Sequence, residues 1–176
     1  HLSPEDQQVM SDLPPVLKER FQRMQVVYHI RLMQRYANIL LGGFHIEEAI
    51  YGPRYYYPGI EIQEDRRFEV EMPNDTILVL LTARRETIEQ RMKADPHDFQ
   101  VVKVDDIPLL LDRFNDQYEA SWLKQKFQID TSDLTPAQLL DAFLDGSVLH
   151  LNTADALMRL LEAAGHGVVT PGERSP

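Results

Sequence analysis

Ile77-Leu78-Val79-Leu80-Leu81-Thr82 is the stretch that decides the fold of this 176-residue chain. Its five apolar residues do not alternate with polar ones, a pattern typical of a parallel strand that is covered on both faces. A charged helix is predicted directly after it, over residues 85–93, and Asp95-Pro96 ends that helix. A strand followed at once by a helix predicts an α/β unit built on a mostly parallel sheet.

Two further segments have the length of short strands. Residues 39–41 precede the pair Gly42-Gly43, and residues 126–130 lead into a polar loop. Apolar residues at three- and four-residue spacing, together with local helix-start signals, predict helices around these strands. The predicted helices cover residues 15–37, 44–51, 105–122, 136–144 and 153–164. The sequence therefore predicts an α/β fold, with a mostly parallel sheet flanked by helices on both faces.

The remaining segments complete the expected organisation. The first twelve residues are predicted to be an irregular lead-in, with Asp12 capping the helix over residues 15–37. Residues 60–72 are expected to form either a helix or an irregular charged segment. We expect three regions along the chain: an α/β domain over residues 1–145, a helical extension over residues 146–166, and a disordered tail over residues 167–176.

The helix predicted over residues 15–37 carries more apolar residues than one sheet contact requires. Its main stripe is formed by Leu17, Phe21, Met24, Tyr28, Leu32 and Tyr36. Val26, Val27 and Ile30 lie outside that stripe. We therefore expect this helix to be buried on more than one side.

Composition restricts the classes of function. The formal net charge of −10 argues against a nucleic-acid-binding protein, because such proteins rely on cations that neutralise phosphates. No run reaches the roughly 18 apolar residues of a membrane span, and no signal-peptide pattern follows His1. The chain has no cysteine, which fits a cytoplasmic location, and no pattern of metal ligands is present.

Polar residues follow each predicted strand, where ligands bind in open parallel sheets. His45, Glu47, Glu48 and Tyr51 follow the strand at residues 39–41. After the strand at residues 77–82 comes a basic group formed by Arg84, Arg85, Arg91 and Lys93. The third strand leads into Asp130, Thr131, Ser132 and Asp133. The first two of these strand ends, each followed by charged residues, predict a site of nucleotide size.

The order of these segments resembles the thymidylate-kinase and nucleoside-kinase branch of the P-loop kinases, over residues 15–145. The resemblance is carried by Phe44–Gly52, Leu78–Arg91 and Ile129–Pro136. It implies that Glu48 and Tyr51 contact the acceptor substrate, and that the basic group (Arg84, Arg85, Arg91 and Lys93) closes over the phosphates of ATP. It also implies that residues 130–133 lie beside the base of the donor nucleotide. In that family the helix equivalent to residues 15–37 often joins two subunits, so the resemblance implies a homodimer that uses the additional face of this helix.

The chain departs from this family at two positions that matter for chemistry. Gly42-Gly43 stands where the family keeps Asp-Arg, and no Gly-x-x-x-x-Gly-Lys-Ser/Thr motif occurs. The central first strand of the family is also not visible before Ile39. A segment upstream of His1, a rebuilt fold, or a partner that completes the sheet would each account for this.

Each candidate also has a simpler structural interpretation. Glu47 and Glu48 suit the start of a helix for electrostatic reasons, and a lone histidine such as His45 is often a hydrogen-bonded structural residue. The basic group is also compatible with a solvated helix face, and residues 130–133 with an ordinary strand-to-helix turn. The aromatic run Tyr55–Tyr57 suits either base stacking or a packed turn.

Two functions remain open at this point. The first is an ATP- and Mg-dependent nucleoside or nucleotide kinase-like phosphotransferase that is inactive as the chain stands, with His45, Glu47 and Glu48 as the candidate catalytic residues. The second is a non-catalytic member of the family that binds a nucleotide or only a partner protein. Phosphoryl transfer depends on positioned amides, cations and Mg, so the two departures argue against turnover by these 176 residues.

Overall fold

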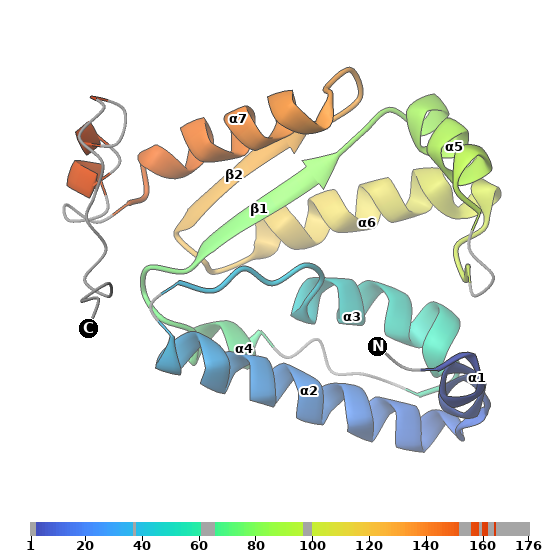
Figure 1. Ribbon diagram of the computed structural model, residues 1–176. Coiled ribbons are helices and arrows are strands. Elements are labelled where there is room, and N and C mark those ends of the chain that lie inside the picture. Colours follow the sequence, from blue (N-terminus) through green and yellow to red (C-terminus); the bar gives the residue numbers. More distant parts are fainter. Residues whose placement is uncertain are drawn as a thin grey trace, which may run out of the picture. The chain divides into compact units, whose positions relative to one another are not determined.

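The structure is a computed structural model that describes residues 3–36, 38–60, 66–96, 100–151, 156–158, 160–161 and 164. Its contacts divide the chain into two units, His1–Asp133 and Leu134–Pro176, and each unit is described by itself. The described residues form a mixed α/β structure that is mostly helical and contains a two-stranded parallel sheet (Figure 1). The domain division predicted from the sequence stays a prediction.

The sheet confirms two of the three predicted strands. β1 (Ile77–Thr82) pairs in parallel with β2 (Gln125–Asp130), and the register places Ile77 opposite Gln125 and Thr82 opposite Asp130. The two strands therefore end level with each other. β1 is only half-buried, and Leu81 is 54% exposed, so the expected burial of both faces is wrong for this strand. The reason is that helices of the first unit cover it incompletely.

The strand predicted at residues 39–41 is wrong. These residues have no regular secondary structure, and Leu40 is 80% exposed. A strand becomes stable only when a neighbour satisfies its backbone groups, and no described strand lies in register with this run. The three apolar residues instead lead into Gly43, whose φ of 74° turns the chain toward the next helix.

The first helix of the structure was not predicted. α1 (Pro4–Asp12) begins at a capping box, in which the Ser3 hydroxyl accepts from the Asp6 N–H and the Asp6 carboxylate accepts from the Ser3 N–H. The expected irregular lead-in is therefore wrong over these residues. Asp12 ends α1 and does not cap the next helix, whose N-cap position is Pro14.

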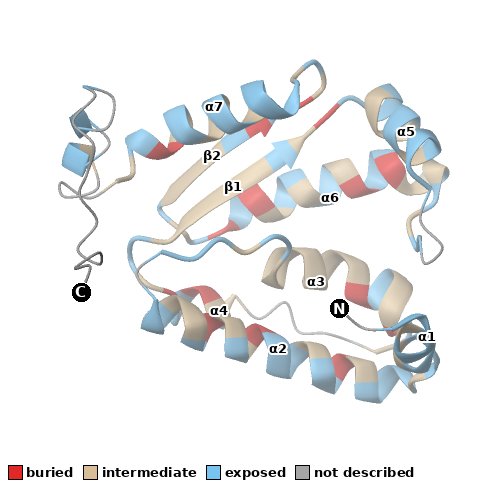
Figure 2. Ribbon diagram, viewed as in Figure 1, coloured by how far each residue is buried: buried red, intermediate tan, exposed pale blue. Residues whose placement is uncertain are grey.

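The long helix α2 (Pro15–Arg35) confirms the predicted helix, but the predicted core face is wrong. Val26 and Ile30 are buried and form a core cluster with Met72, against which Met33, Phe44, Phe68 and Leu123 pack. The expected main stripe faces outward, with Met24 and Tyr28 62% and 58% exposed. Figure 2 shows exposed positions recurring along α2. Burial on more than one side is therefore not found within the described chain.

Three short helical segments connect α2 to the sheet. α3 (His45–Tyr51) confirms the predicted helical turns at residues 44–51, and a π-helical turn, η1 (Gly52–Tyr56), continues it. α4 (Arg67–Val70) is the described helical part of the predicted segment 60–72, of which residues 61–65 lie outside the described residues. The Gln34 side chain donates to the carbonyl of Glu71 at 2.8 Å and ties α2 to the end of α4.

Two helices of the first unit accompany the sheet. α5 (Arg85–Ala94) follows β1 and confirms the predicted helix 85–93. A 3₁₀ turn, η2 (Val104–Asp106), leads into α6 (Ile107–Ala120), which contacts β1 and α3 (Figure 1). Ile107, Leu110 and Tyr118 of α6 are buried. α6 thus supports β1 from one side and places β2 beside it.

The second unit contains α7 (Pro136–Val148), which begins at the predicted capping box between Thr135 and Gln138. Its start confirms the prediction, and its end lies four residues beyond the expected Leu144. Of the helix predicted over residues 153–164, residues 156–158 and 160–161 are helical, and the others except Ala164 lie outside the described residues, as does the predicted tail 167–176.

Candidate functional site

The carboxyl ends of β1 and β2 are joined by hydrogen bonds just after the strands. Thr131 donates to the carbonyl of Thr82 twice, from its backbone N–H at 2.8 Å and from its hydroxyl at 3.0 Å. Thr131 itself is buried. These bonds fix the loop after β2 against the start of α5, and the polar residues of both segments therefore lie together.

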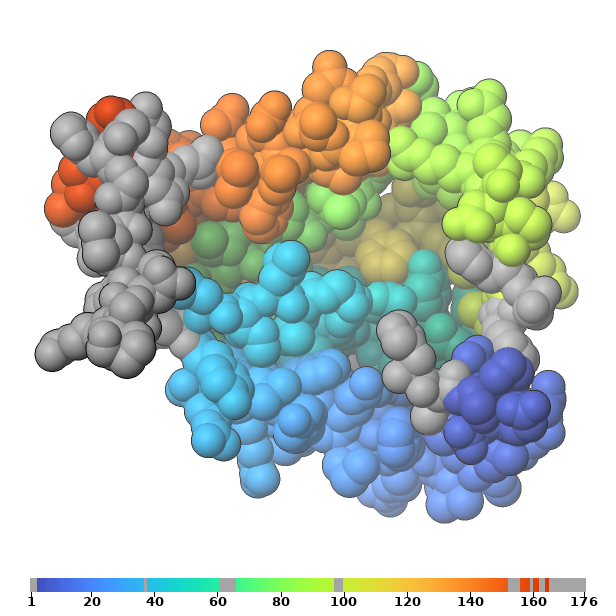
Figure 3. All heavy atoms as spheres, in the orientation of Figure 1, coloured from blue at the N-terminus to red at the C-terminus, as the bar shows by residue number. Residues whose placement is uncertain are grey.

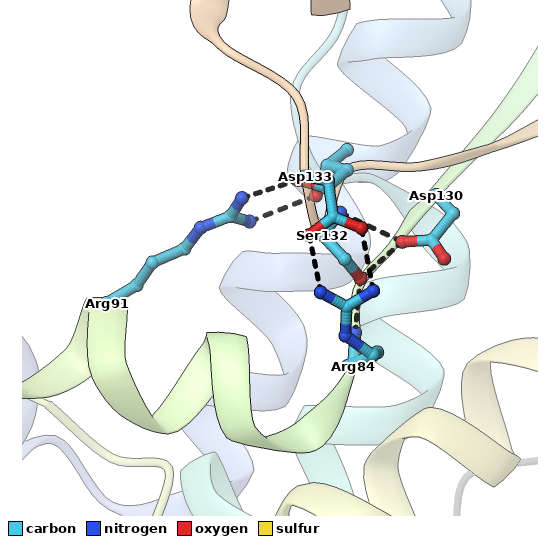
Figure 4. Close-up of polar contacts among 6 residues, drawn as sticks. Arg84, Arg91, Asp130, Ser132 and Asp133 are labelled. Atoms are coloured by element: carbon cyan, nitrogen blue, oxygen red, sulfur yellow. Dashed lines mark hydrogen bonds and ion pairs between the residues drawn. The ribbon is translucent and has the colours of Figure 1, made fainter.

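Arg84 lies at the N-cap position of α5 and bridges to the loop after β2. Its backbone N–H donates to the Ser132 hydroxyl at 2.7 Å, and its guanidinium donates to both oxygens of Asp133, at 2.8 and 2.5 Å (Figure 4). Both side chains are exposed. The hydrogen bond from Arg84 lowers the pKa of Asp133, and the same bond raises the pKa of Arg84. The bidentate geometry is the one that arginine uses for carboxylates and phosphates.

Arg91 reaches the same loop from the other end of α5. Its guanidinium donates to the Thr131 hydroxyl at 2.9 Å and to the Thr131 carbonyl at 2.6 Å, and Figure 4 shows it pointing from the helix toward the loop. Asp130 turns the loop, because its carboxylate accepts from the N–H and the hydroxyl of Ser132. The hydroxyl bond is the main reason why the pKa of Asp130 is lowered.

We name Arg84, Arg91 and residues 130–133 the strand-end cluster. The structure thus brings together two of the four predicted phosphate-binding cations and the predicted nucleotide-base loop. Arg85 is outside the cluster, since it pairs with Glu89 one turn along α5 at 2.6 Å, and Lys93 is exposed on the same helix. The hydrogen bonds within residues 130–133 are also those of an ordinary strand-to-helix turn. Both interpretations of this loop, a nucleotide-base loop and a simple turn, therefore remain open.

The residues predicted on the acceptor side gather around α3. Glu48 accepts a hydrogen bond from the Tyr57 hydroxyl, and Tyr57 is 1% exposed. Burial raises the pKa of Glu48 and that of Glu47. Tyr51 packs edge-on against the rings of Tyr55, Tyr56 and Phe114, and burial raises its pKa to about 12. The aromatic run therefore forms a packed turn with a fully buried Tyr57, rather than a row of exposed rings.

His45 is held by a buried carboxylate that sequence reasoning missed. Its Nε2 lies 2.9 Å from Oε1 of Glu69, and the other oxygen of Glu69 accepts from the backbone N–H of Trp122 at 2.6 Å. The Glu69 side chain is 2% exposed and the His45 side chain 11%. His45 Nδ1 is buried without a partner among the described residues. These contacts give His45 a structural role that links α3, α4 and the segment before β2.

A second missed contact holds η1 against η2, the turn that precedes α6. Asp106 accepts from the Arg54 guanidinium and from the Tyr55 hydroxyl, the latter at 2.7 Å. The hydrogen bond from Arg54 is the main reason why the pKa of Asp106 is lowered. The sequence carried no periodic signal for this pair, whose members lie 52 positions apart.

Within the described residues, no group of three or more His, Asp or Glu side chains is arranged to hold a metal ion. Among the described helices, none is long and apolar enough to cross a membrane. A comparison with protein-family models gives no match, and neither do comparisons with curated proteins and with solved structures. The function is therefore inferred from the residues of the site.

Proposed function

We propose that this protein is a nucleotide kinase-like phosphotransferase-family protein that binds the phosphates of a nucleotide at the strand-end cluster. The observation that carries the proposal is that two parallel strands end level and direct Arg84 and Arg91 to one loop. Open α/β sheets bind ligands at this edge. ATP with Mg is the proposed donor, and a nucleoside or nucleotide is the proposed acceptor, next to Glu48 and Tyr51.

To bind phosphate at this cluster, the arginines would exchange their present hydrogen-bond acceptors for phosphate oxygens. The fork of Arg84 already holds Asp133, and both side chains of that pair are exposed, so a phosphate would replace a carboxylate of similar geometry. Arg91 has its guanidinium on Thr131, where the carbonyl is a neutral acceptor. A doubly charged phosphate is a stronger acceptor than a carbonyl, which makes Arg91 the cation whose partner is exchanged most readily.

The second candidate is a non-catalytic member that binds a nucleotide or a partner protein. A specific observation favours it: at Gly43 the backbone conformation is one that favours glycine. A Cβ atom on Gly43 would lie 1.9 Å from Oε2 of Glu47, and its φ is 74°. The arginine that the kinase family keeps at this step therefore does not fit the conformation found here. The absence of cysteine is the support for a cytoplasmic location, which we also propose.

Calorimetric titration of the purified chain with ATP, ADP and thymidine monophosphate, with and without Mg, tests the proposal. We expect Arg91→Ala to weaken ATP binding about tenfold, the effect of losing one charge-assisted hydrogen bond. Arg85→Ala is the matched control, because it removes the same charge from the same helix but from a residue paired with Glu89. The control should bind ATP within about twofold of the unmodified chain, since surface substitutions away from a site have small effects.

The outcomes separate the candidates. Binding that is lost in Arg91→Ala but kept in Arg85→Ala supports the strand-end cluster, and a coupled assay for ADP release then distinguishes enzyme from binding protein. No heat of binding with any of the three nucleotides, at concentrations up to the millimolar range, would overturn the proposal. Equal losses in both variants would also overturn it, because they would show that only the general positive charge of α5 matters.

A further inference from the structure

The outward face of α2 is an apolar stripe bordered by arginines. Arg20, Arg23, Met24, Val27, Tyr28 and Arg31 line an open groove with a volume of about 440 Å³. The stripe continues toward the start of the helix with Leu17 and Phe21, which are 50% and 43% exposed. Figure 3 shows α2, in blue, at the surface of its unit. Apolar side chains exposed in a continuous row commonly mark a surface that binds another protein.

The charge of this helix is opposite to that of the rest of the protein. α2 carries five Lys and Arg residues and one Glu, a charge of +4, so the remainder of the chain carries −14. Its one acidic residue, Glu19, is buried and paired with Arg23. Two α2 helices packed on each other across a two-fold axis would bring their arginines together, and like charges oppose such a contact. The partner surface should therefore be acidic as well as apolar.

The chain itself contains a helix of that kind in its other unit. α7 has exposed Leu140, Leu144 and Val148, which are spaced four residues apart and therefore form one row. Asp141 and Asp145 are exposed beside this row, and α7 contains no Lys or Arg. An apolar row with acidic neighbours is the complement of the α2 groove. Anionic membranes are a poorer match for α2, because the net charge of −10 repels them.

We infer that the groove of α2 binds α7 of a second copy of this chain. The contact pairs unlike surfaces, so each copy offers one groove and one acidic helix. A closed dimer results when both contacts form between the same two copies. The inference is independent of nucleotide binding, since the strand-end cluster contributes no residue to either surface.

Sedimentation velocity of the full chain over roughly 1–100 µM tests the inference, because this range spans the affinities of weak and moderate protein dimers. Circular dichroism verifies that each variant is folded. We expect the unmodified chain to dimerise, and we expect Arg31→Glu and Asp141→Lys each to raise the dimer Kd at least about fivefold, because each places like charges across the contact. Arg113→Glu makes the same charge change at an exposed residue of α6, a helix that belongs to neither surface, and should leave the Kd unchanged. Dimerisation should also weaken as salt is raised, because screening reduces attraction between exposed charges.

An equimolar mixture of the two single variants, Arg31→Glu and Asp141→Lys, provides the decisive measurement. In a mixed dimer one contact brings the two substituted positions together with their charges exchanged, and the other contact retains the original arginine and aspartate. Both contacts of the mixed dimer therefore pair opposite charges. Dimerisation should return in the mixture, a result that a folding defect in either variant cannot produce.

Several results would overturn the inference. The first is an unmodified chain that remains monomeric at about 100 µM, a concentration well above the Kd of a typical specific dimer. This result would also be seen if α7 bound α2 of the same chain. The second is dimers that are insensitive to Arg31→Glu and Asp141→Lys. The third is binding to phosphatidylserine vesicles that is lost in Arg31→Glu, which would assign the groove to a membrane surface.

Discussion

Replacing Glu69 by alanine should destabilise the first unit of the chain by about 2–4 kcal/mol. The Glu69 carboxylate is buried and accepts from His45 Nε2 at 2.9 Å and from the Trp122 N–H at 2.6 Å. Each buried donor that loses its acceptor costs about 1–3 kcal/mol. Two such donors give about 2–6 kcal/mol. We expect the lower part of that range, because the His45 side chain keeps 11% exposure, which lets water reach it.

Urea unfolding monitored by fluorescence measures this free energy directly. Trp122 is the single tryptophan of the chain, and its backbone N–H is one of the affected donors, so the probe reports on the altered site. Glu71→Ala is the matched control, because Glu71 is exposed and the hydrogen bond that ties it to α2 uses its backbone carbonyl. The control should stay within about 0.5 kcal/mol of the unmodified chain. A loss below about 1 kcal/mol for Glu69→Ala, the least that one orphaned donor costs, would refute the reasoning.

The pH dependence of the same measurement has a definite sign. Burial alone would raise the pKa of Glu69, but hydrogen bonds from His45, Trp122 N–H and Ser121 together lower it from its ordinary 4.5. A lowered carboxyl pKa contributes stability above the pKa of the unfolded chain, and that contribution is lost as the pH falls through the folded value. The difference between Glu69→Ala and the unmodified chain should therefore be full at about pH 7 and shrink below about pH 4.5. A difference that grows in acid would contradict this.

Local geometry and the missing motifs lead to three further predictions. Gly43→Ala should lower the free energy of unfolding by about 1–2 kcal/mol, because its φ is 74° and the new Cβ would meet Glu47 at 1.9 Å. Gly42→Ala, with nothing within 4 Å, should cost less than half as much in the same urea titration, and equal costs for the two variants would contradict this. Thr135→Ala removes the capping box and should lower the free energy of hydrogen-exchange protection of the first amides of α7 by about 1 kcal/mol. Unchanged protection would show that the cap contributes little. The purified 176-residue chain should show no ADP release above background with Mg, ATP and any nucleotide acceptor. The double variant Gly42→Asp, Gly43→Arg should not release ADP either. Measured phosphoryl transfer would mean that another residue supplies the missing charges.

The elements that could be predicted from the sequence are those whose local signals have one interpretation. The five apolar residues before Thr82 have the length of a strand, and the capping box at Thr135 marks the start of a helix. The run at residues 39–41 is too short for periodicity to distinguish a strand from an extended loop, and pairing, which decides it, is not local. The capping box at Ser3 has the same sequence pattern as that at Thr135, so α1 could also have been predicted from the sequence.

The face of α2 shows a different limit. Its apolar residues form two rows, and hydrophobic spacing identifies both rows without saying which one meets the core. Val26 and Ile30 are the buried row because Met72 and its neighbours pack against them, a fact that depends on contacts between residues far apart in the sequence. The longer row faces outward, and its Met24 and Tyr28 line the groove proposed to bind a second copy, together with Val27 and three arginines.

The sequence predicted that the residues of the strand-end cluster lie close together. It did not predict which acceptors its arginines bind. Parallel neighbours place their carboxyl ends together, which brings Arg84 to the loop 130–133. The pairing of Arg84 with Asp133, and that of His45 with Glu69, depends on how side chains pack in three dimensions. Glu69 in particular lies in a segment with no periodic signal, so nothing in the sequence distinguished it from its neighbour Glu71.

These pairings determine how tightly the cluster can hold an anion. Arg84 gains a phosphate only by giving up Asp133, so the net free energy is the difference between two similar bidentate contacts. Asp133→Asn removes the competing charge while keeping the size of the side chain. If the cluster binds nucleotide phosphates, this variant should therefore bind ATP more tightly than the unmodified chain in the same calorimetric titration. Affinity that falls instead would show that Asp133 orders the loop for the ligand rather than competing with it.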